Sequence, residues 1–202
     1  MMNIIIGLVL AYLLGSIPTG LWIGKFFFKK NLREYGSGNT GTTNTFRVLG
    51  KTAGTATFII DFLKGTFATL LPFLLHINGI SPMIFGLLAV LGHTFPIFAR
   101  FKGGKAVATG SGVFIFLYPA LSALLLVIFF STLFITGYVS LGSILICLTS
   151  IVYLAIFETG VDKWVMIVMC IFVIYMHKKN IQRLLNGTEN QSKAKLRLGR
   201  KK

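Results

Sequence analysis

Four polar segments interrupt an otherwise apolar sequence, and their residue types suit the binding of phosphate. They are rich in hydroxyl, amide, glycine and cationic residues but contain hardly any carboxylates, and they cover residues 36–47, 102–105, 138–143 and 177–189. Backbone N–H groups near glycines, together with Lys and Arg side chains, bind anions and above all phosphate. The sequence therefore predicts a site for anionic substrates, provided that the fold brings these segments to one place.

Two of the segments hold the strongest candidates for contact with phosphate. Arg47 can bind a phosphate through two nitrogen atoms at once, whereas Lys105 supplies a compact point charge. Gly103 and Gly104 directly precede this lysine and leave room for a ligand to approach the backbone. Lys102 is expected to be a solvated or lipid-facing charge.

Ser37 and Asn39 have two interpretations. Their side chains suit hydrogen bonds to substrate oxygens, which is the interpretation we favour. Alternatively, they cap a helix that begins near Thr40, because Ser and Asn are common residues at helix N-termini.

Several other kinds of site are excluded by the motifs. Gly36-x-Gly38-x-x-Gly41 matches the dinucleotide-binding pattern, but no strand–helix–strand unit surrounds it. The sequence contains no Gly-x-Ser-x-Gly nucleophile motif and no His-x4-Asp pair. Cys147 and Cys170 lie in apolar runs without Cys-x-x-Cys spacing, so we expect neither a disulfide framework nor a metal site.

The composition identifies the elements that have to position these segments. Of the 202 residues, 54% are hydrophobic and only 12% are charged, and the mean hydropathy is +0.80. A soluble domain would have about a quarter of its residues charged. Apolar runs of about twenty residues, each long enough to cross a bilayer, recur along the chain. The sequence therefore predicts an all-α, polytopic membrane protein with one domain over residues 1–202.

The apolar runs predict seven transmembrane helices. One tract, residues 106–136, would be about 46 Å long as a single helix, which is too long for one crossing, and Pro119 favours a break near its middle. An arrangement of five spans with a re-entrant pair would, like seven spans, put the two termini on opposite sides of the membrane. The other predicted spans are 3–24, 52–75, 81–99, 139–157 and 161–176.

The charges favour the seven-span arrangement. The chain carries 20 Lys and Arg against 5 Asp and Glu, a net charge of +15. Seven spans place eighteen of the twenty basic residues on one side, as the positive-inside bias requires, with the N-terminus outside and the C-terminus in the cytoplasm. The positive-inside bias explains the high net charge better than binding to nucleic acid does, and we do not expect nucleic acid as a partner. The basic tail, about residues 190–202, is expected to lie on anionic lipid.

Polar residues inside the spans have structural interpretations. Asp61 and Lys64 are three residues apart on one predicted helix, so we expect an intramembrane ion pair. His93, just before Pro96, is expected to be a packing histidine. The four polar segments all fall on the predicted cytoplasmic side.

Three motifs resemble the PlsY family of bacterial integral-membrane acyl-phosphate:glycerol-3-phosphate acyltransferases. The first is Gly-Ser-Gly-Asn…Thr-Asn-x-x-Arg-x-Leu-Gly over residues 36–50. The second is Gly-His-x-x-Pro followed by Phe-Lys-Gly-Gly-Lys-x-Val-Ala-Thr over 92–109, and the third is His-x-x-Asn-Ile…Leu-Leu-x-Gly-Thr-Glu over 177–189. The resemblance extends over almost the whole chain. Gly137 departs from it, because this position is usually basic in the family.

The resemblance implies an activity and a location. Members transfer an acyl group from acyl phosphate to the 1-hydroxyl of glycerol 3-phosphate, giving lysophosphatidic acid and phosphate, the first acylation of phospholipid synthesis. They need no cofactor, and they use neither acyl-CoA nor acyl carrier protein as direct donor. The expected location is the bacterial plasma membrane, in contact with its lipids and with the active site at the cytoplasmic face. Functional links to an acyl-phosphate-forming enzyme and to a second acyltransferase are plausible.

The resemblance also assigns roles to residues. The glycine-lysine loop is implied to bind the phosphate of glycerol 3-phosphate. The implied catalytic residues are Ser37, Arg47, Lys105, His177 and Asn180. The implied substrate-binding residues are Gly36, Gly38, Asn39, Asn44, Gly103, Gly104, Ser143 and Glu189. For Glu189 we favour the alternative role of folding the tail back onto the site.

The role of His177 stays open between two interpretations. Acyl phosphate has a good leaving group, so catalysis can rest on positioning and charge stabilisation without a strong base. His177 either accepts the hydroxyl proton or only orients a substrate whose own phosphate takes it, and we favour the second.

Two other classes of function are less consistent with the sequence. An anion transporter would have polar residues along a path through the bilayer and often two related halves. Here only Asp61 and Lys64 break the apolar interior, and no repeat is visible. A phosphotransferase acting on lipid alcohols usually needs several carboxylates around a divalent ion, but the predicted cytoplasmic segments offer only Glu34 and Glu189.

Overall fold

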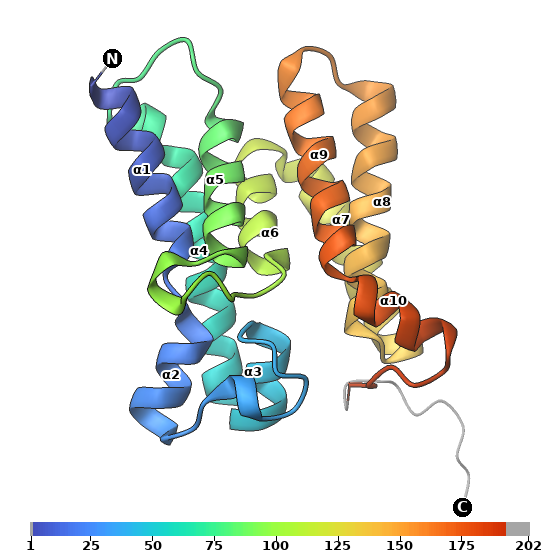
Figure 1. Cartoon of the computed structure of the whole chain (residues 1–202). Coiled ribbons are helices and arrows are strands. Elements are labelled where there is room, and N and C mark those ends of the chain that lie inside the picture. Colours follow the sequence, from blue (N-terminus) through green and yellow to red (C-terminus); the bar gives the residue numbers. More distant parts are fainter. Residues whose placement is uncertain (1, 193–202) are drawn as a thin grey trace, which may run out of the picture. The chain divides into compact units, whose positions relative to one another are not determined.

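The structure is a computed structural model that describes residues 2–192. Every regular element in this range is a helix, which confirms the all-α prediction (Figure 1). The elements are α1 (Met2–Ser16), α2 (Thr19–Phe28), the 3₁₀ helix η1 (Leu32–Glu34), α3 (Thr42–Leu49), α4 (Lys51–Leu74), α5 (Pro82–Thr94), the 3₁₀ helix η2 (Ile97–Ala99), α6 (Val107–Leu117), α7 (Pro119–Thr136), α8 (Val139–Phe157), α9 (Val161–Met176) and α10 (Lys178–Leu185).

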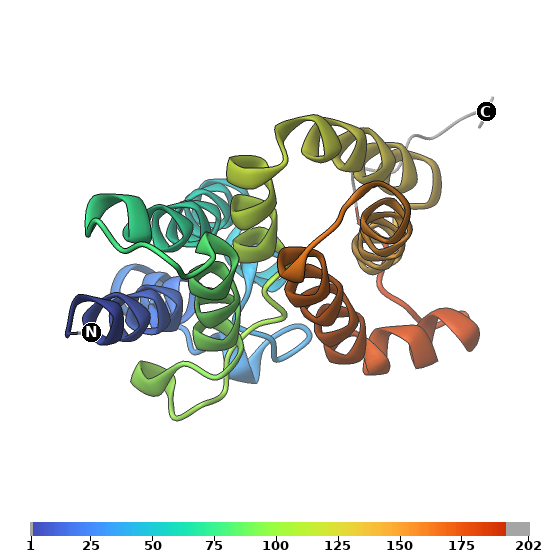
Figure 2. The ribbon, with the colours of Figure 1, turned by 90° about the horizontal axis from the view of Figure 1, so that it is seen from above.

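The described residues divide into two compact units, one that ends at Tyr118 and one that begins at Pro119. In the first unit, α1, α4, α5 and α6 pack against one another, and α3 packs on α4 (Figures 1 and 2). The second unit consists of α7, α8 and α9, which contact one another in chain order, followed by the short α10. That the whole chain forms one domain stays a prediction.

The first predicted span is broken, and in this detail the sequence analysis was wrong. Residues 3–24 were expected to form one helix, but α1 ends at Ser16 and α2 begins at Thr19 with a bend of 46° between them. Pro18 lies at the break. Proline interrupts a helix because it has no N–H for a helical hydrogen bond and its ring clashes with the preceding turn. Residues at the far end of α2 are thereby turned away from the line of α1.

Helices of the first unit approach closely through glycines. A Cβ atom at Gly65 of α4 would lie 2.0 Å from the carbonyl oxygen of Thr109 in α6, and one at Gly112 would lie 2.0 Å from that of Phe62. In the pair α1 and α5, a Cβ atom at Gly15 would lie 2.1 Å from the carbonyl oxygen of Ala89. Small residues at such contacts are typical of helices packed in a membrane.

The boundaries of the other apolar segments agree closely with the prediction. The tract over residues 106–136 is divided, because α6 ends at Leu117 and α7 begins at Pro119. Within residues 2–192, four helices are long and apolar enough to cross a bilayer, or up to six if each bent pair counts as one span, and α6 is a shorter apolar helix. The seven-span arrangement therefore stays a prediction.

The close contact of α4 and α6 gives a test of the packing. We expect Gly112→Ala to lower the melting temperature in detergent by about 5 °C or more, because the added methyl group would force these helices apart. The measurement is thermal unfolding of the purified protein, followed by the loss of its monodisperse chromatographic peak.

Gly110→Ala is the matched control on the same helix. A Cβ atom there would have Val90 Cγ2 as its nearest neighbour, at 4.0 Å, and alanine favours a helix more than glycine does. Its melting temperature should equal or exceed that of the wild type. Equal losses in both variants would contradict the close helix approach.

Candidate active site

The buried side chain of Asn44 shapes the loop that carries the first motif. Its Nδ2 donates to three carbonyl oxygens of this loop, and its Oδ1 accepts from the Ser37 N–H at 2.9 Å. The three acceptors are Leu32 at 3.2 Å, Tyr35 at 3.0 Å and Asn39 at 2.8 Å. Buried polar groups with all partners satisfied fix local structure firmly. Asn44, predicted to bind substrate, is placed here as the residue that organises the loop.

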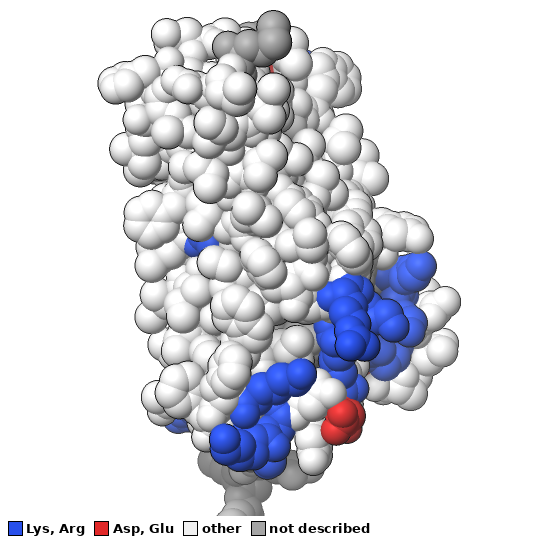
Figure 3. Space-filling model, turned by 60° about the vertical axis from the view of Figure 1, so that its left-hand side comes forward, with Lys and Arg blue, Asp and Glu red and all other residues white. Residues whose placement is uncertain are grey.

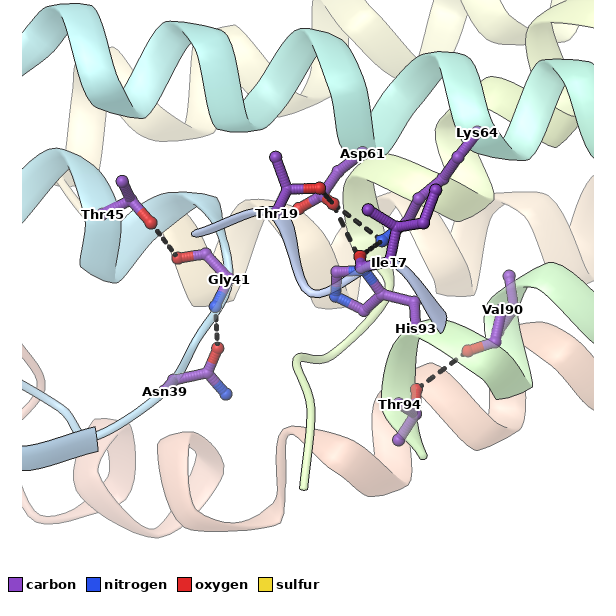
Figure 4. A network of polar contacts seen from close by, with 10 residues as sticks. All are labelled: Ile17, Thr19, Asn39, Gly41, Thr45, Asp61, Lys64, Val90, His93 and Thr94. Carbon is purple, nitrogen blue, oxygen red and sulfur yellow. Dashed lines mark hydrogen bonds and ion pairs between the residues drawn. The ribbon is translucent and has the colours of Figure 1, made fainter. Parts of the chain in front are cut away.

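Ser37 and Arg47 are both exposed beside this organising residue. An Nη of Arg47 lies 3.5 Å from Asn44 Oδ1, which is a long contact. Helix α3 begins at Thr42 with Gly41 as its N-cap and without a side-chain cap, so neither Ser37 nor Asn39 caps it. Asn39 Oδ1 instead accepts the Gly41 N–H at 2.8 Å (Figure 4).

The glycine loop is tied to the end of α5. The Gly103 N–H donates to the carbonyl oxygen of Thr94 at 3.0 Å, and the Gly104 N–H donates to that of His93 at 3.1 Å. The two loops are neighbours, because a Cβ atom at Gly41 would lie 3.9 Å from Gly104 Cα. The first unit thus places the segment of the first motif, at Gly41, next to the loop that ends in Lys105.

Arg33 links these loops, and the sequence analysis missed it. One Nη of Arg33 donates to the carbonyl oxygens of Ala99, at 2.5 Å, and Lys102, at 2.7 Å. Guanidinium groups can satisfy several acceptors in fixed geometry. No sequence signal marks this contact, because backbone carbonyls are present at every position.

An ion pair lies at the bend between α1 and α2, as predicted. Lys64 Nζ is 2.8 Å from Asp61 Oδ1, and both side chains are almost fully buried. The same ammonium donates to the carbonyl oxygen of Ile17 at 2.9 Å, and the Thr19 hydroxyl donates to Asp61 at 2.9 Å (Figure 4). His93 is buried next to this pair, which fits a packing role, but within residues 2–192 its Nδ1 has no hydrogen-bond partner, so the ring is not a fully satisfied packing histidine.

In the second unit, His177 and Asn180 lie at the junction of α9 and α10. His177 Nδ1 is 2.8 Å from the carbonyl oxygen of Val173. A carbonyl can only accept, so Nδ1 carries a proton and Nε2 is the acceptor nitrogen of the neutral ring. Both side chains are buried, as is Ser143, whose hydroxyl donates to the Val139 carbonyl oxygen at 3.0 Å.

Glu189 joins the segment after α10 to the rest of the second unit. Its Oε1 accepts from Asn180 Nδ2 at 2.6 Å and from the Ser140 hydroxyl at 2.8 Å, while Oε2 pairs with Arg183 Nε at 2.6 Å. Burial raises the pKa of Glu189, but these hydrogen bonds and the arginine charge outweigh it and hold the pKa below its ordinary value. The contacts support the tail-folding alternative for this residue.

The chain continues from Glu189 across the turn between α7 and α8. The Ser192 N–H donates to the Gly137 carbonyl oxygen at 2.7 Å. Gly137 has a φ of +81°, a conformation that favours glycine. Residues 193–202, which hold most of the predicted lipid-bound tail, lie outside the described residues.

Basic side chains gather toward one end of the protein face drawn in Figure 3, and the rest of this face is largely uncharged. The exposed cations of the first unit include Lys25, Lys29 and Lys30 at the end of α2 and Arg100 and Lys102 after η2. Apolar rings interleave them, with Trp22 packed on Phe98 at 6.2 Å between centroids. Aromatic and basic residues together are typical of the lipid headgroup region.

Comparison with known proteins identifies the family. Residues 5–187 match the family described as glycerol-3-phosphate acyltransferase. The chain belongs to this family. It is 61% identical to the glycerol-3-phosphate acyltransferase of Streptococcus sanguinis over 199 residues, covering 94% of this chain and 92% of the relative, and 59% identical to that of Streptococcus gordonii, covering 94% and 93%.

Solved structures of the acyltransferase family share this fold. A crystal structure of PlsY (YgiH), an integral membrane glycerol 3-phosphate acyltransferase in its glycerol 3-phosphate form, is similar with a TM-score of 0.86 and 38% identity, covering 93% of this chain and 94% of the other. The lysophosphatidic acid form has a TM-score of 0.83 and 36% identity, covering 94% and 95%. The predicted resemblance to PlsY is confirmed, and the chain is an all-α integral membrane acyltransferase.

The structure places the predicted acyltransferase residues in each unit as follows. In the first unit, the loop with Gly36, Ser37, Gly38 and Asn39 leads into α3, which carries Asn44 and Arg47, and it meets the loop of Gly103, Gly104 and Lys105 where Gly41 approaches Gly104. In the second unit, Asn180 bonds to Glu189, His177 begins the same turn of chain, and Ser143 lies on α8 three residues after Ser140, which also bonds to Glu189. That these groups form one site stays a prediction. Among residues 2–192, no three His, Cys, Asp or Glu are grouped to hold a metal ion.

The Arg33 contact predicts a loss of acyltransferase activity. We expect Arg33→Ala to lower the specific activity by about tenfold or more, because hydrogen bonds to a charged group contribute roughly 1.5–3 kcal/mol each. Arg100→Ala is the control, since it removes an exposed cation from the same loop. A similar loss in both variants would show that charge near the loop matters rather than the two hydrogen bonds.

The contacts of Glu189 predict a pH-dependent stability. A carboxylate whose pKa is lowered by folding stabilises the protein above its ordinary pKa, and this stabilisation is lost as the pH falls through the lower folded value. Glu189→Gln should therefore melt a few degrees below the wild type at neutral pH, and the difference should shrink as the pH falls below 4.5, the ordinary pKa of a glutamate. Glu158→Gln serves as control, and a constant difference for Glu189→Gln across this range would refute the prediction.

Proposed function

We propose that the protein transfers an acyl group from acyl phosphate to the 1-hydroxyl of glycerol 3-phosphate, giving lysophosphatidic acid and inorganic phosphate. The observation that carries this proposal is the adjacency of two loops, one with Ser37 and Arg47 and the other with Gly103, Gly104 and Lys105. The two similar PlsY structures are a glycerol 3-phosphate form and a lysophosphatidic acid form. Loops rich in glycine and cations suit the phosphate that both ligands contain.

The reaction is an acyl transfer between two oxygens. The 1-hydroxyl oxygen attacks the acyl carbon and forms the new ester bond, while the bond from that carbon to the phosphate oxygen breaks. The phosphate leaves with the electron pair of the broken bond and becomes inorganic phosphate. The hydroxyl proton passes to a phosphate group of one of the substrates. Arg47 and Lys105 stabilise the phosphate charge, and Gly103 and Gly104 admit the phosphate of glycerol 3-phosphate close to the backbone.

The remaining polar residues orient the substrates. Ser37 and Ser143 provide hydroxyls, and Asn180 an amide, for the oxygens of the substrates. His177 presents Nε2 as its acceptor nitrogen, because Nδ1 is held by a carbonyl oxygen. It orients the glycerol hydroxyl, and the phosphate of a substrate takes the proton.

The protein lies in the bacterial plasma membrane with seven spans, the N-terminus outside and the C-terminus in the cytoplasm. Counting each bent pair as one span and adding α6 gives this number, which supports the arrangement. The substrates then meet the protein at the cytoplasmic face, where the basic loops lie. One domain over residues 1–202 binds both substrates, and enzymes that make acyl phosphate and that add a second acyl group act before and after it.

The donor assay tests the reaction directly. Purified protein is incubated with glycerol 3-phosphate and palmitoyl phosphate, with and without EDTA, and separately with palmitoyl-CoA, and lysophosphatidic acid and phosphate are measured. We expect equal amounts of both products from palmitoyl phosphate, unchanged in EDTA, and none from palmitoyl-CoA. Product only from the CoA ester, or from neither donor, would overturn the proposal.

A further inference from the structure

One buried polar group, the imidazole of His93, has no part in the proposed reaction. His93 is only 9% exposed, at the end of α5, and its Nδ1 lies 3.7 Å from Asp61 Oδ1. Figure 4 shows the ring beside the ion pair of Asp61 and Lys64. Burying an imidazole costs free energy, so its position calls for a physical reason.

The other side of the ring supports the glycine loop. A Cβ atom at Gly104 would lie 2.1 Å from His93 Nε2, and 3.0 Å and 3.1 Å from its Cδ2 and Cε1. Separations below about 3 Å between such atoms are not tolerated in packed interiors. The imidazole therefore fills the place that any side chain at Gly104 would occupy.

The backbone of the same histidine also holds the loop. Its carbonyl oxygen accepts the Gly104 N–H at 3.1 Å. The neighbouring Gly103 differs, because its Cβ would lie 2.0 Å from the carbonyl oxygen of His93 and 2.6 Å from Pro96 Cδ. The two glycines are thus required by different atoms, one by the ring and the other by the backbone.

Behind the ring lies Asp61, whose Oδ1 is 3.7 Å from Nδ1, a contact longer than a hydrogen bond, and within residues 2–192 Nδ1 has no hydrogen-bond partner. Asp61 is fixed by Lys64 at 2.8 Å and by the Thr19 hydroxyl at 2.9 Å, and these contacts leave the carboxylate beside Nδ1. A continuous series of contacts therefore leads from the bend between α1 and α2, through Asp61 and His93, to Gly104 and the adjoining Lys105.

We propose that His93 is a positioning residue that sets the shape of the Gly103–Gly104 loop, and that Gly104 is glycine because the imidazole lies behind it. This inference rests on the proposed function of the loop in binding the phosphate of glycerol 3-phosphate. It differs from the view that both glycines serve only to admit the ligand. If only the ligand required Gly104, changing His93 would not relieve a substitution there.

A double-mutant cycle tests this directly. Gly104→Ala should raise the KM for glycerol 3-phosphate by about tenfold or more, while the KM for palmitoyl phosphate stays unchanged. His93→Ala alone should raise the same KM less. The double variant should have a KM within about threefold of that of His93→Ala, because the added methyl group then has room.

Gly103→Ala is the matched control. Its methyl group would strike the backbone oxygen of residue 93, which remains after His93→Ala, so no rescue is expected. The proposal would be overturned if the KM of the double variant at positions 93 and 104 rose by the product of the two single increases. Equal rescue of both glycine variants would overturn it as well.

A second measurement separates this inference from the proposed function. The melting temperatures of the same variants form a cycle that needs no substrate, and the same rescue is expected there. If wild-type protein gave no product from palmitoyl phosphate, the proposed function would fail while the thermal cycle still decided the inference. His93→Ser provides a second small side chain should His93→Ala not fold.

Discussion

The ion pair of Asp61 and Lys64 is the interaction on which the first unit depends. A proline at position 18 breaks the helix and frees backbone groups that a membrane interior cannot solvate. Lys64 satisfies the freed carbonyl oxygen of Ile17, and Asp61 accepts the hydroxyl of Thr19, the first residue of α2. A buried ion pair is costly by itself, but here each charge has a second partner in the broken segment. The pair thus stabilises a bend that a continuous apolar helix would not form.

The bend determines where the first motif lies. Beyond it, α2 packs so closely on the following loop that a Cβ atom at Gly20 would lie 2.3 Å from the carbonyl oxygen of Thr40. The loop then returns over Asn44, and Arg33 joins it to the segment before Gly103. Because each contact uses backbone atoms, the loops are held by the fold, and their exposed side chains are left to meet ligands.

The sequence predicted what depends on local pattern. The limits of α8 and α9 and the break before Pro119 follow from hydropathy and proline, and the ion pair follows from helical spacing. The prediction from the sequence failed at Pro18, where apolar residues on both sides suggested one continuous helix. It also missed Arg33, since a contact between a side chain and backbone carbonyls more than sixty residues away leaves no pattern. The role of Asn44 in organising its loop left no pattern either, because its carbonyl partners come from the fold; that Asn44 also binds substrate stays a prediction.

Several of the chain's few carboxylates have structural contacts, and this bears on whether the acyl transfer uses a strong base. Among the chain's five acidic residues, Asp61 and Glu189 accept bonds from cations, hydroxyls or amides that shape the two units. Glu34 accepts from the Asn31 amide at 2.5 Å, and Glu158 and Asp162 flank the start of α9, whereas His177 follows its other end. A site assembled from hydroxyls, amides and cations has little basicity of its own. Such a site suits a donor that is already activated, because positioning and neutralisation of phosphate charge then suffice for transfer.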